Sequence, residues 1–69
     1  MKKTVLIVDD SFYMRSVLRK YLETAGYDVV GEAENGEKGI DLALSLKPAV
    51  ITLDIILRNY YYYICLRYC

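Results

Sequence analysis

The chain has no histidine and no excess of charge of either sign. Without histidine, a serine nucleophile has no imidazole base, so that kind of catalysis is excluded. Nine basic and nine acidic residues give a net charge of zero. A nucleic-acid scaffold would normally be basic, and a membrane surface would attract a polybasic segment. We therefore expect neither nucleic acid nor a membrane as a partner.

Long hydrophobic runs are also lacking, and cysteine is scarce. No apolar stretch is long enough to cross a bilayer, and Asp9 interrupts the first run too early for a signal peptide. The two cysteines, Cys65 and Cys69, could bridge only the C-terminal tail. We interpret them as free thiols of a reducing cytoplasm, because a zinc site would need two further ligands. The sequence therefore predicts a cytoplasmic protein.

What the chain does contain is an alternation of strand and helix patterns. Its 69 residues allow one small domain of marginal stability. Apolar, β-branched runs at Thr4–Val8 and Ala49–Leu53, with a shorter one within Tyr27–Glu32, are typical of strands buried on both faces. Helical spacing predicts one helix over about Phe12–Ala25 and a second between Asn35 and Lys47. The order βαβαβ predicts an α/β fold with a parallel sheet.

Each predicted helix carries an apolar stripe, which we expect to face the core. Asp10-Ser11 supplies capping chemistry for the first helix, and Gly26 stands at its expected left-handed end. Gly39 weakens the second helix by about 1 kcal/mol relative to alanine. The stripes consist of Met14, Leu18, Tyr21, Leu22 and Ala25 in the first helix and Ile40, Ala43, Leu44 and Leu46 in the second.

Three carboxylates follow the two longest predicted strands. Asp9 and Asp10 come directly after the first strand, and Asp54 comes directly after the third. In a parallel sheet these acids would meet at the rim where ligands bind, and a hard cation such as Mg²⁺ would relieve their repulsion. Other interpretations stay open: Asp9 as a solvated loop acid, Asp10 as a helix cap, and Asp54 as an exposed strand-end acid.

The tail differs in kind from the rest of the chain. Five of the eight tyrosines lie after Arg58, together with Ile64 and both cysteines. This composition favours an extended strand over a short helix capped by Asn59. A stacking platform for single-stranded nucleic acid is a weaker alternative, since no basic groove accompanies the rings.

Several groups of residues together resemble the start of a response-regulator receiver domain. The resemblance covers residues 3 to about 57 and is closest to the chemotaxis-type single-domain receivers. It implies a partial flavodoxin-like fold with a three-stranded parallel sheet in the order 2-1-3. The matching residues are Val5–Ser11, Met14-Arg15, Leu18, Ala25–Tyr27, Glu32–Glu37 and Lys47–Asp54.

In that family a magnesium ion and an aspartate carry the chemistry. The resemblance implies that Asp54 is the phospho-acceptor and that Asp9, Asp10, Asp54 and the main-chain carbonyl of Ile56 hold Mg²⁺. It further implies a signalling domain rather than an enzyme, with a sensor histidine kinase as partner in a two-component phosphorelay. The alternative is a non-signalling receiver fragment that acts only as a self-associating structural module.

The resemblance stops soon after Asp54. The proline expected about four residues later is absent, and no residue matches the hydroxyl and lysine that the family carries on later strands. We therefore expect a truncated receiver-like domain over residues 1–57 and an aberrant Tyr-rich tail over 58–69, interpreted as an out-of-frame or prematurely stopped product. The tail is a candidate added strand. Because one copy is too small to close its own core, we also expect self-association.

Overall fold

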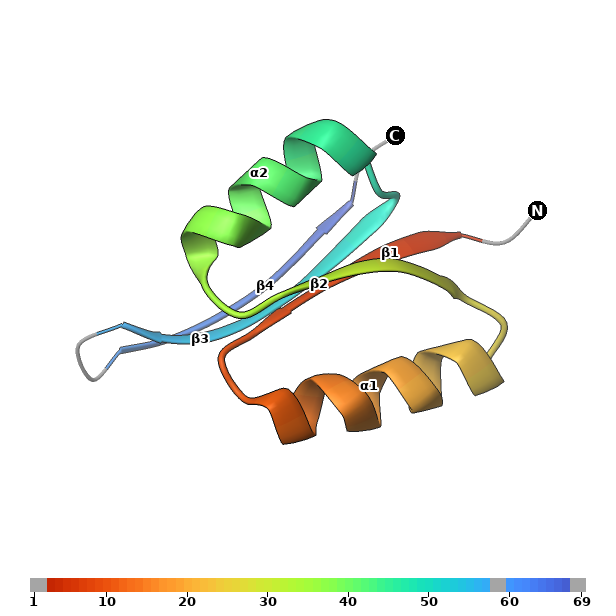
Figure 1. Ribbon diagram of the computed structural model, residues 1–69, viewed down its shortest axis with the longest axis horizontal. Coiled ribbons are helices and arrows are strands. Elements are labelled where there is room, and N and C mark those ends of the chain that lie inside the picture. The colour runs from red at the N-terminus through yellow and green to blue at the C-terminus, as the bar shows by residue number, and fades with distance from the viewer. Residues whose placement is uncertain (1–2, 58–59, 68–69) are drawn as a thin grey trace.

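A single mixed sheet with a helix on each face forms the molecule. The computed structural model describes the backbone of residues 3–57 and 60–67 and the side chains of residues 3–53 (Figure 1). In the sheet the strand order is β2-β1-β3-β4, and the first three of these strands are parallel. The predicted α/β unit with parallel order 2-1-3 is confirmed. The elements are β1 (Thr4–Asp9), α1 (Phe12–Thr24), β2 (Asp28–Ala33), α2 (Gly36–Leu46), β3 (Val50–Leu57) and β4 (Tyr60–Arg67).

The central strand β1 is buried because both of its faces are covered. Alternate side chains of a strand point to opposite faces. Val5 and Ile7 contact the α1 side, where Leu18 and Leu22 pack. Leu6 and Val8 belong to the cluster on the other face, against which Leu42 and Ala43 of α2 pack. Figure 1 shows the two helices on opposite sides of the sheet. A strand flanked in this way needs a continuous apolar run, which is the pattern seen at the start of the chain.

Both helices begin where capping chemistry predicts. The Oγ of Ser11 accepts a hydrogen bond from the amide of Met14 at 3.3 Å, and Asn35 Oδ1 accepts from the amide of Lys38 at 2.8 Å. Gly26 follows α1 with a φ of 95°, a left-handed conformation that suits glycine. The Ser11 cap, two residues after the end of β1 at Asp9, fixes where α1 begins.

The predicted helix stripes are partly wrong. Tyr21, Ile40 and Leu44 were expected to face the core, yet their exposed fractions are 73%, 63% and 71%. Met14 is also more than a third exposed, at 39%. Each helix contacts the sheet along one line of side chains, and among the described residues no further helix lies beside it to cover the rest of an apolar stripe.

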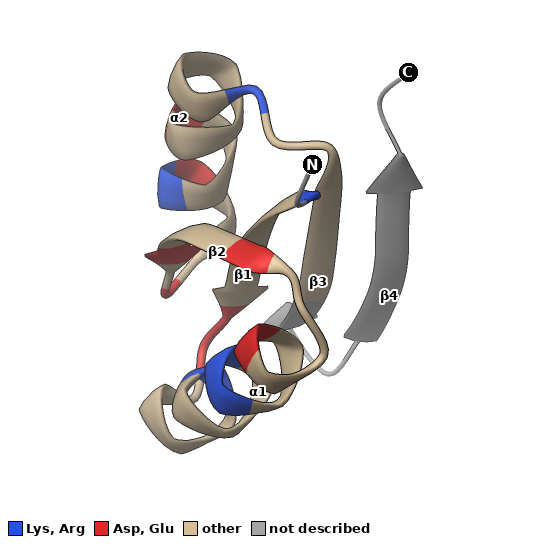
Figure 2. Cartoon of the chain, turned by 90° about the vertical axis from the view of Figure 1, so that its right-hand side faces the viewer, with Lys and Arg blue, Asp and Glu red and all other residues tan. Residues whose placement is uncertain are grey.

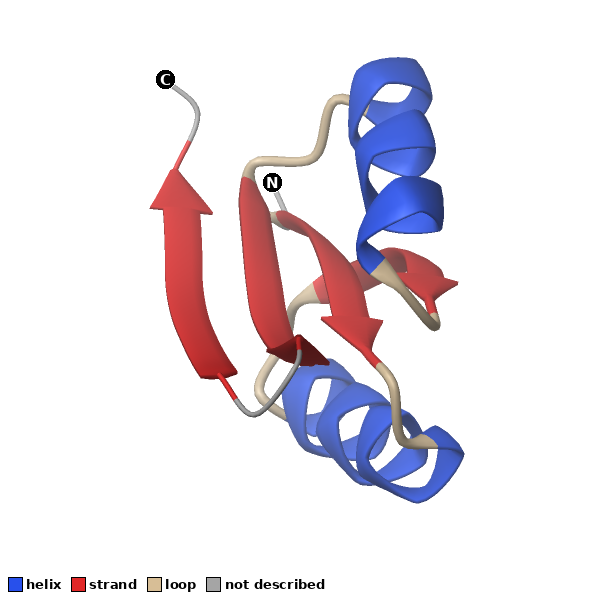
Figure 3. Ribbon diagram, turned by 90° about the vertical axis from the view of Figure 1, so that its left-hand side faces the viewer, coloured by secondary structure: helices blue, strands red, loops and turns tan. Residues whose placement is uncertain are grey.

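The Tyr-rich tail forms a strand, as its composition favours. β4 pairs antiparallel with β3 from Leu57↔Tyr60 to Val50↔Arg67, so it covers the outer edge of β3 (Figure 3). β3 therefore runs on to Leu57, beyond the predicted end at Leu53, because β4 supplies backbone partners past the end of β1. Asn59, the cap of the alternative short helix, lies outside the described residues. Within the described part of the chain, no helix has the length and apolarity needed to cross a membrane.

Candidate functional site

The acids meet at the carboxyl end of the parallel strands. In the β1–β3 ladder, Asp9 stands opposite Asp54 in register, directly after the pair Val8↔Leu53. Asp10 is the next residue along the chain and is exposed. The backbone therefore brings all three positions to one rim of the sheet, on the two strands at its centre. Ligands of open parallel sheets bind at this rim.

Asp9 is buried and only half satisfied. Its side chain is 2% exposed, and its Oδ1 accepts a hydrogen bond from the amide of Ser11 at 2.8 Å. Its Oδ2 is buried and has no hydrogen-bond partner among the described residues. A buried carboxylate oxygen without a partner is costly unless a cation or donor approaches it. The interpretation of Asp9 as a solvated loop acid is therefore wrong, and its free oxygen fits a site for a hard cation.

The structure decides which of Asp10 and Ser11 caps the first helix, a point that the sequence left open. Ser11, not Asp10, is the N-cap of α1, since its hydroxyl accepts from the first turn. The cap interpretation of Asp10 is therefore wrong. Its carboxylate remains at the rim beside Asp9 with no capping role.

Asp54 and Ile56 are placed by their backbone alone. Both lie in β3, with Asp54 opposite Tyr63 and Ile56 opposite Tyr61 on the β4 side. Among residues with described side chains, no three acidic, cysteine or histidine groups gather closely enough to hold a metal. With described side chains the rim thus offers Asp9 and Asp10, and the backbone places the position of Asp54 opposite Asp9.

Sequence reasoning missed Arg15. Its Nη1 donates to the main-chain oxygen of Asp9 at 2.6 Å, and its Nε lies 3.3 Å from Oε1 of Glu32 on β2. Figure 2 shows the acidic end of β1 beside the basic residues of α1. The sequence identified Arg15 only as part of the family motif, because Glu32 lies on another strand and only the fold brings it near.

Arg19, one turn further along α1, forms an ion pair with the other oxygen of the same carboxylate, Glu32 Oε2. The hydrogen bond to Glu32, together with the nearby charges of Glu32 and Glu23, raises the pKa of Arg19 above its ordinary value. Glu32 therefore holds two guanidinium groups, of which only that of Arg15 also reaches the end of β1.

The comparisons with known proteins identify the family. The model of the response regulator receiver domain matches residues 5–60. The chain belongs to the response-regulator receiver family. This receiver is 47% identical over 55 residues to the chemotaxis protein CheY of Thermotoga maritima, covering 80% of the chain and 46% of that protein. It is 50% identical over 50 residues to a protein-glutamate methylesterase/protein-glutamine glutaminase of Halobacterium salinarum, covering 72% of the chain and 14% of that protein.

A solved structure agrees with the receiver fold. The response regulator domain of Thermotoga maritima CheB superposes with a TM-score of 0.79 at 40% sequence identity, covering 88% of this chain and 46% of that one. The receiver thus spans about half the length of CheY and of the CheB domain, and a smaller share of the methylesterase. Membership in the family places the chain among chemotaxis-type two-component receivers.

Proposed function

We propose that this receiver accepts a phosphoryl group on Asp54, in a reaction that requires Mg²⁺. The observation that carries the proposal is the register of Asp9 with Asp54 at the rim, next to a buried Asp9 oxygen that has no hydrogen-bond partner among residues with described side chains. The carboxylate of Asp54 attacks phosphorus and forms an acyl phosphate, while the bond from phosphorus to the donor nitrogen breaks and the donor imidazole regains its proton. The donor is a sensor histidine kinase of a chemotaxis-type relay.

The residues that would hold Mg²⁺ are the carboxylates of Asp9, Asp10 and Asp54 and the main-chain carbonyl of Ile56. Bound there, the ion would neutralise charge on the transferring group. All of these ligands offer oxygen, which is the donor that Mg²⁺ prefers. The chain's own part is to bring the acids together on two adjacent strands and to leave Asp9 Oδ2 without a hydrogen bond from the part of the chain whose side chains are described.

Four further expectations belong to this proposal. The protein acts in the cytoplasm, it regulates through the charge of its phosphoryl group and is not itself an enzyme, and it binds neither nucleic acid nor membrane. The fourth is that its receiver-like part ends at about residue 57 and that residues 58–69 are an aberrant tail. A new phosphoryl group at the rim adds negative charge there, which a partner can sense.

The test is incubation of the full chain with a small acyl-phosphate donor and Mg²⁺, followed by intact mass measurement. We expect one added phosphoryl group, lost in Asp54→Asn and absent when the metal is chelated. Asp28→Asn is the matched control, because Asp28 pairs with Thr4 at the opposite end of the parallel sheet. Incorporation that persists in Asp54→Asn, or none in the unmodified chain, would contradict the proposal.

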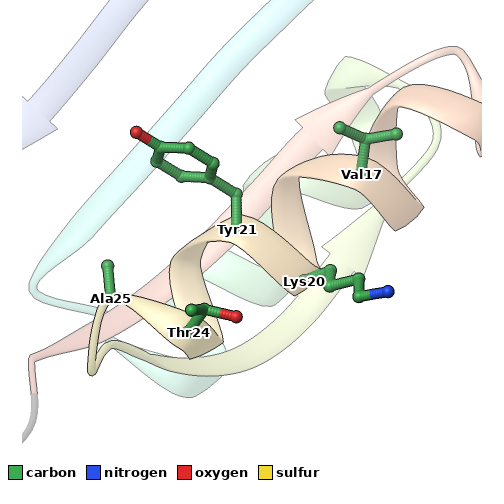
Figure 4. Close-up of a pocket in the computed structure, with 5 residues that line it drawn as sticks. All are labelled: Val17, Lys20, Tyr21, Thr24 and Ala25. Carbon is green, nitrogen blue, oxygen red and sulfur yellow. The ribbon is translucent and has the colours of Figure 1, made fainter.

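The alternative function is a structural module that associates with a second copy and accepts no phosphate. Apolar side chains left exposed on the helices favour it, among them Phe12, Tyr13, Val17 and Tyr21 on α1. Five residues of this helix, Val17, Lys20, Tyr21, Thr24 and Ala25, line an open hollow of about 580 Å³, with Tyr21 and Ala25 projecting to one side (Figure 4). Two-fold pairing would bury the same patch on both copies.

Light scattering tests this alternative, with Tyr21→Lys as the disruptive variant. A stable dimer that dissociates in the variant, in a chain that takes up no phosphate, would favour the module. A monomer at all concentrations would exclude it.

A further inference from the structure

We propose that Arg15 is a positioning residue that fixes the acid pair at the end of β1 for cation binding. The inference rests on the proposed function and adds to it a residue that offers no oxygen to the ion. Arg15 acts through the main chain of Asp9, since its Nη1 donates to the Asp9 carbonyl oxygen at 2.6 Å. A charge-assisted bond of this length is among the stronger hydrogen bonds in proteins.

The guanidinium group is itself held in place. Its Nε faces Glu32 on β2 at 3.3 Å, its centre lies 5.7 Å from the ring centroid of Phe12, and the side chain is only 12% exposed. The planar fork of arginine can hold two partners at once with little loss of freedom. Arg15 thus ties three elements together: α1 that carries it, β2 through Glu32, and the end of β1 through Asp9.

Fixing this carbonyl orients both acids. The carbonyl group of Asp9 and the amide of Asp10 belong to one rigid peptide plane, so a bond to the oxygen also sets where the chain turns toward Asp10. On the far side of that peptide, the amide of Ser11 donates back to Asp9 Oδ1 at 2.8 Å. The link between the two acids is therefore held from both ends, and within residues 3–53 no side chain or backbone group bonds to Asp9 Oδ2.

The test compares Arg15→Gln with Arg19→Gln by calorimetric titration of the full chain with Mg²⁺. Both variants remove one guanidinium from Glu32, but Arg19 makes no described contact with Asp9. We expect Arg15→Gln to weaken Mg²⁺ affinity about tenfold, the size seen for residues that orient metal ligands, and Arg19→Gln to change it by less than about twofold. Thermal unfolding of both variants without metal separates this effect from a general loss of stability.

Arg15→Lys is the second variant, and it keeps the inference testable if the glutamine variant does not fold. Lysine retains the charge but cannot reach Glu32 and the Asp9 carbonyl with a rigid fork, so we expect an affinity between those of the original chain and Arg15→Gln. Equal affinities for the Arg15 and Arg19 variants, in a chain that binds Mg²⁺, would overturn the inference and leave the proposed function standing. No binding by the unmodified chain would overturn both.

Discussion

At the scale of single residues, the buried carboxylate of Asp9 is the most unusual feature of the chain. It is almost fully excluded from solvent, and only one of its two oxygens has a hydrogen-bond partner among the described residues. Groups arranged for binding are often held at a cost in stability. Asp9 fits that pattern, because a cation at Oδ2 would satisfy an oxygen that no described residue bonds.

Asp9→Asn should therefore stabilise the metal-free protein while removing its response to Mg²⁺. An amide keeps the acceptor for the Ser11 amide but carries no buried charge, so we expect the free energy of unfolding to rise by about 1 kcal/mol. Denaturant unfolding with and without Mg²⁺ checks both effects. Asp28 is exposed, so Asp28→Asn serves as the control and should keep the Mg²⁺ response of the original chain. A variant destabilised by the change would contradict the explanation.

Single residues also mark the limits of prediction from sequence. The start of α1 could be predicted because a cap depends on the residue type and its immediate neighbours, but the sequence did not decide whether Asp10 or Ser11 is the cap. The role of Arg15 could not be predicted, since it depends on Glu32, which only folding brings close. That Asp9 Oδ2 is buried without a partner among the described residues is likewise a property of the packed structure.

At the scale of elements, the close approach of α2 to β1 explains a glycine that helix propensity alone disfavours. A Cβ built on Gly39 would lie 3.0 Å from both Cγ1 and Cγ2 of Val8. Val8 is buried and β-branched, so its methyl groups have no low-energy alternative position. The glycine allows α2 to pack directly over the strand that carries Asp9.

Gly39→Ala should consequently destabilise the fold, although alanine is the better helix former. Overpacking costs about 1–3 kcal/mol and exceeds the gain in helix propensity of about 1 kcal/mol. The same change made together with Val8→Ala should be neutral or stabilising relative to Val8→Ala alone, because the smaller side chain makes room. Denaturant unfolding of the original chain, the two single variants and the double variant measures the coupling between residues 8 and 39. Equal effects of Gly39→Ala in both backgrounds would show that the contact is not the cause.

Elements differed in how well the sequence predicted them. The unbroken apolar run of β1 predicted that this strand is buried on both faces. The outward position of Tyr21 and Ile40 could not be foreseen, because helical spacing gives a stripe wider than the line of contact with the sheet. The end of β3 was missed since its last residues pair with β4, which lies later in the chain.

At the scale of the whole molecule, the tail takes a position that completes one edge of the sheet. β4 pairs with all eight residues of β3, so that strand has neighbours on both sides for much of its length. An uncovered, apolar edge strand would recruit strands from other molecules. The tail therefore protects β3 whatever its origin.

Removal of residues 58–69 should lower stability and solubility together. We expect faster amide hydrogen exchange across Val50–Leu57 and a lower midpoint in denaturant, because the backbone groups on that side of β3 lose their partners. Removal of residues 68–69 alone is the control, since β4 ends at Arg67. Unchanged hydrogen exchange after removal of residues 58–69 would mean that β4 contributes nothing to the stability of β3.

The direction of β4 has a practical consequence for experiments on the receiver. Because this strand runs back along β3, its last residue lies beside Val50, at the border of the sheet farthest from the acids. A reporter protein or surface tether joined after Arg67 would leave from that border. The opposite border would stay open to a bulky phosphodonor. Assays with the receiver immobilised at this point can therefore be made without obstructing Asp54.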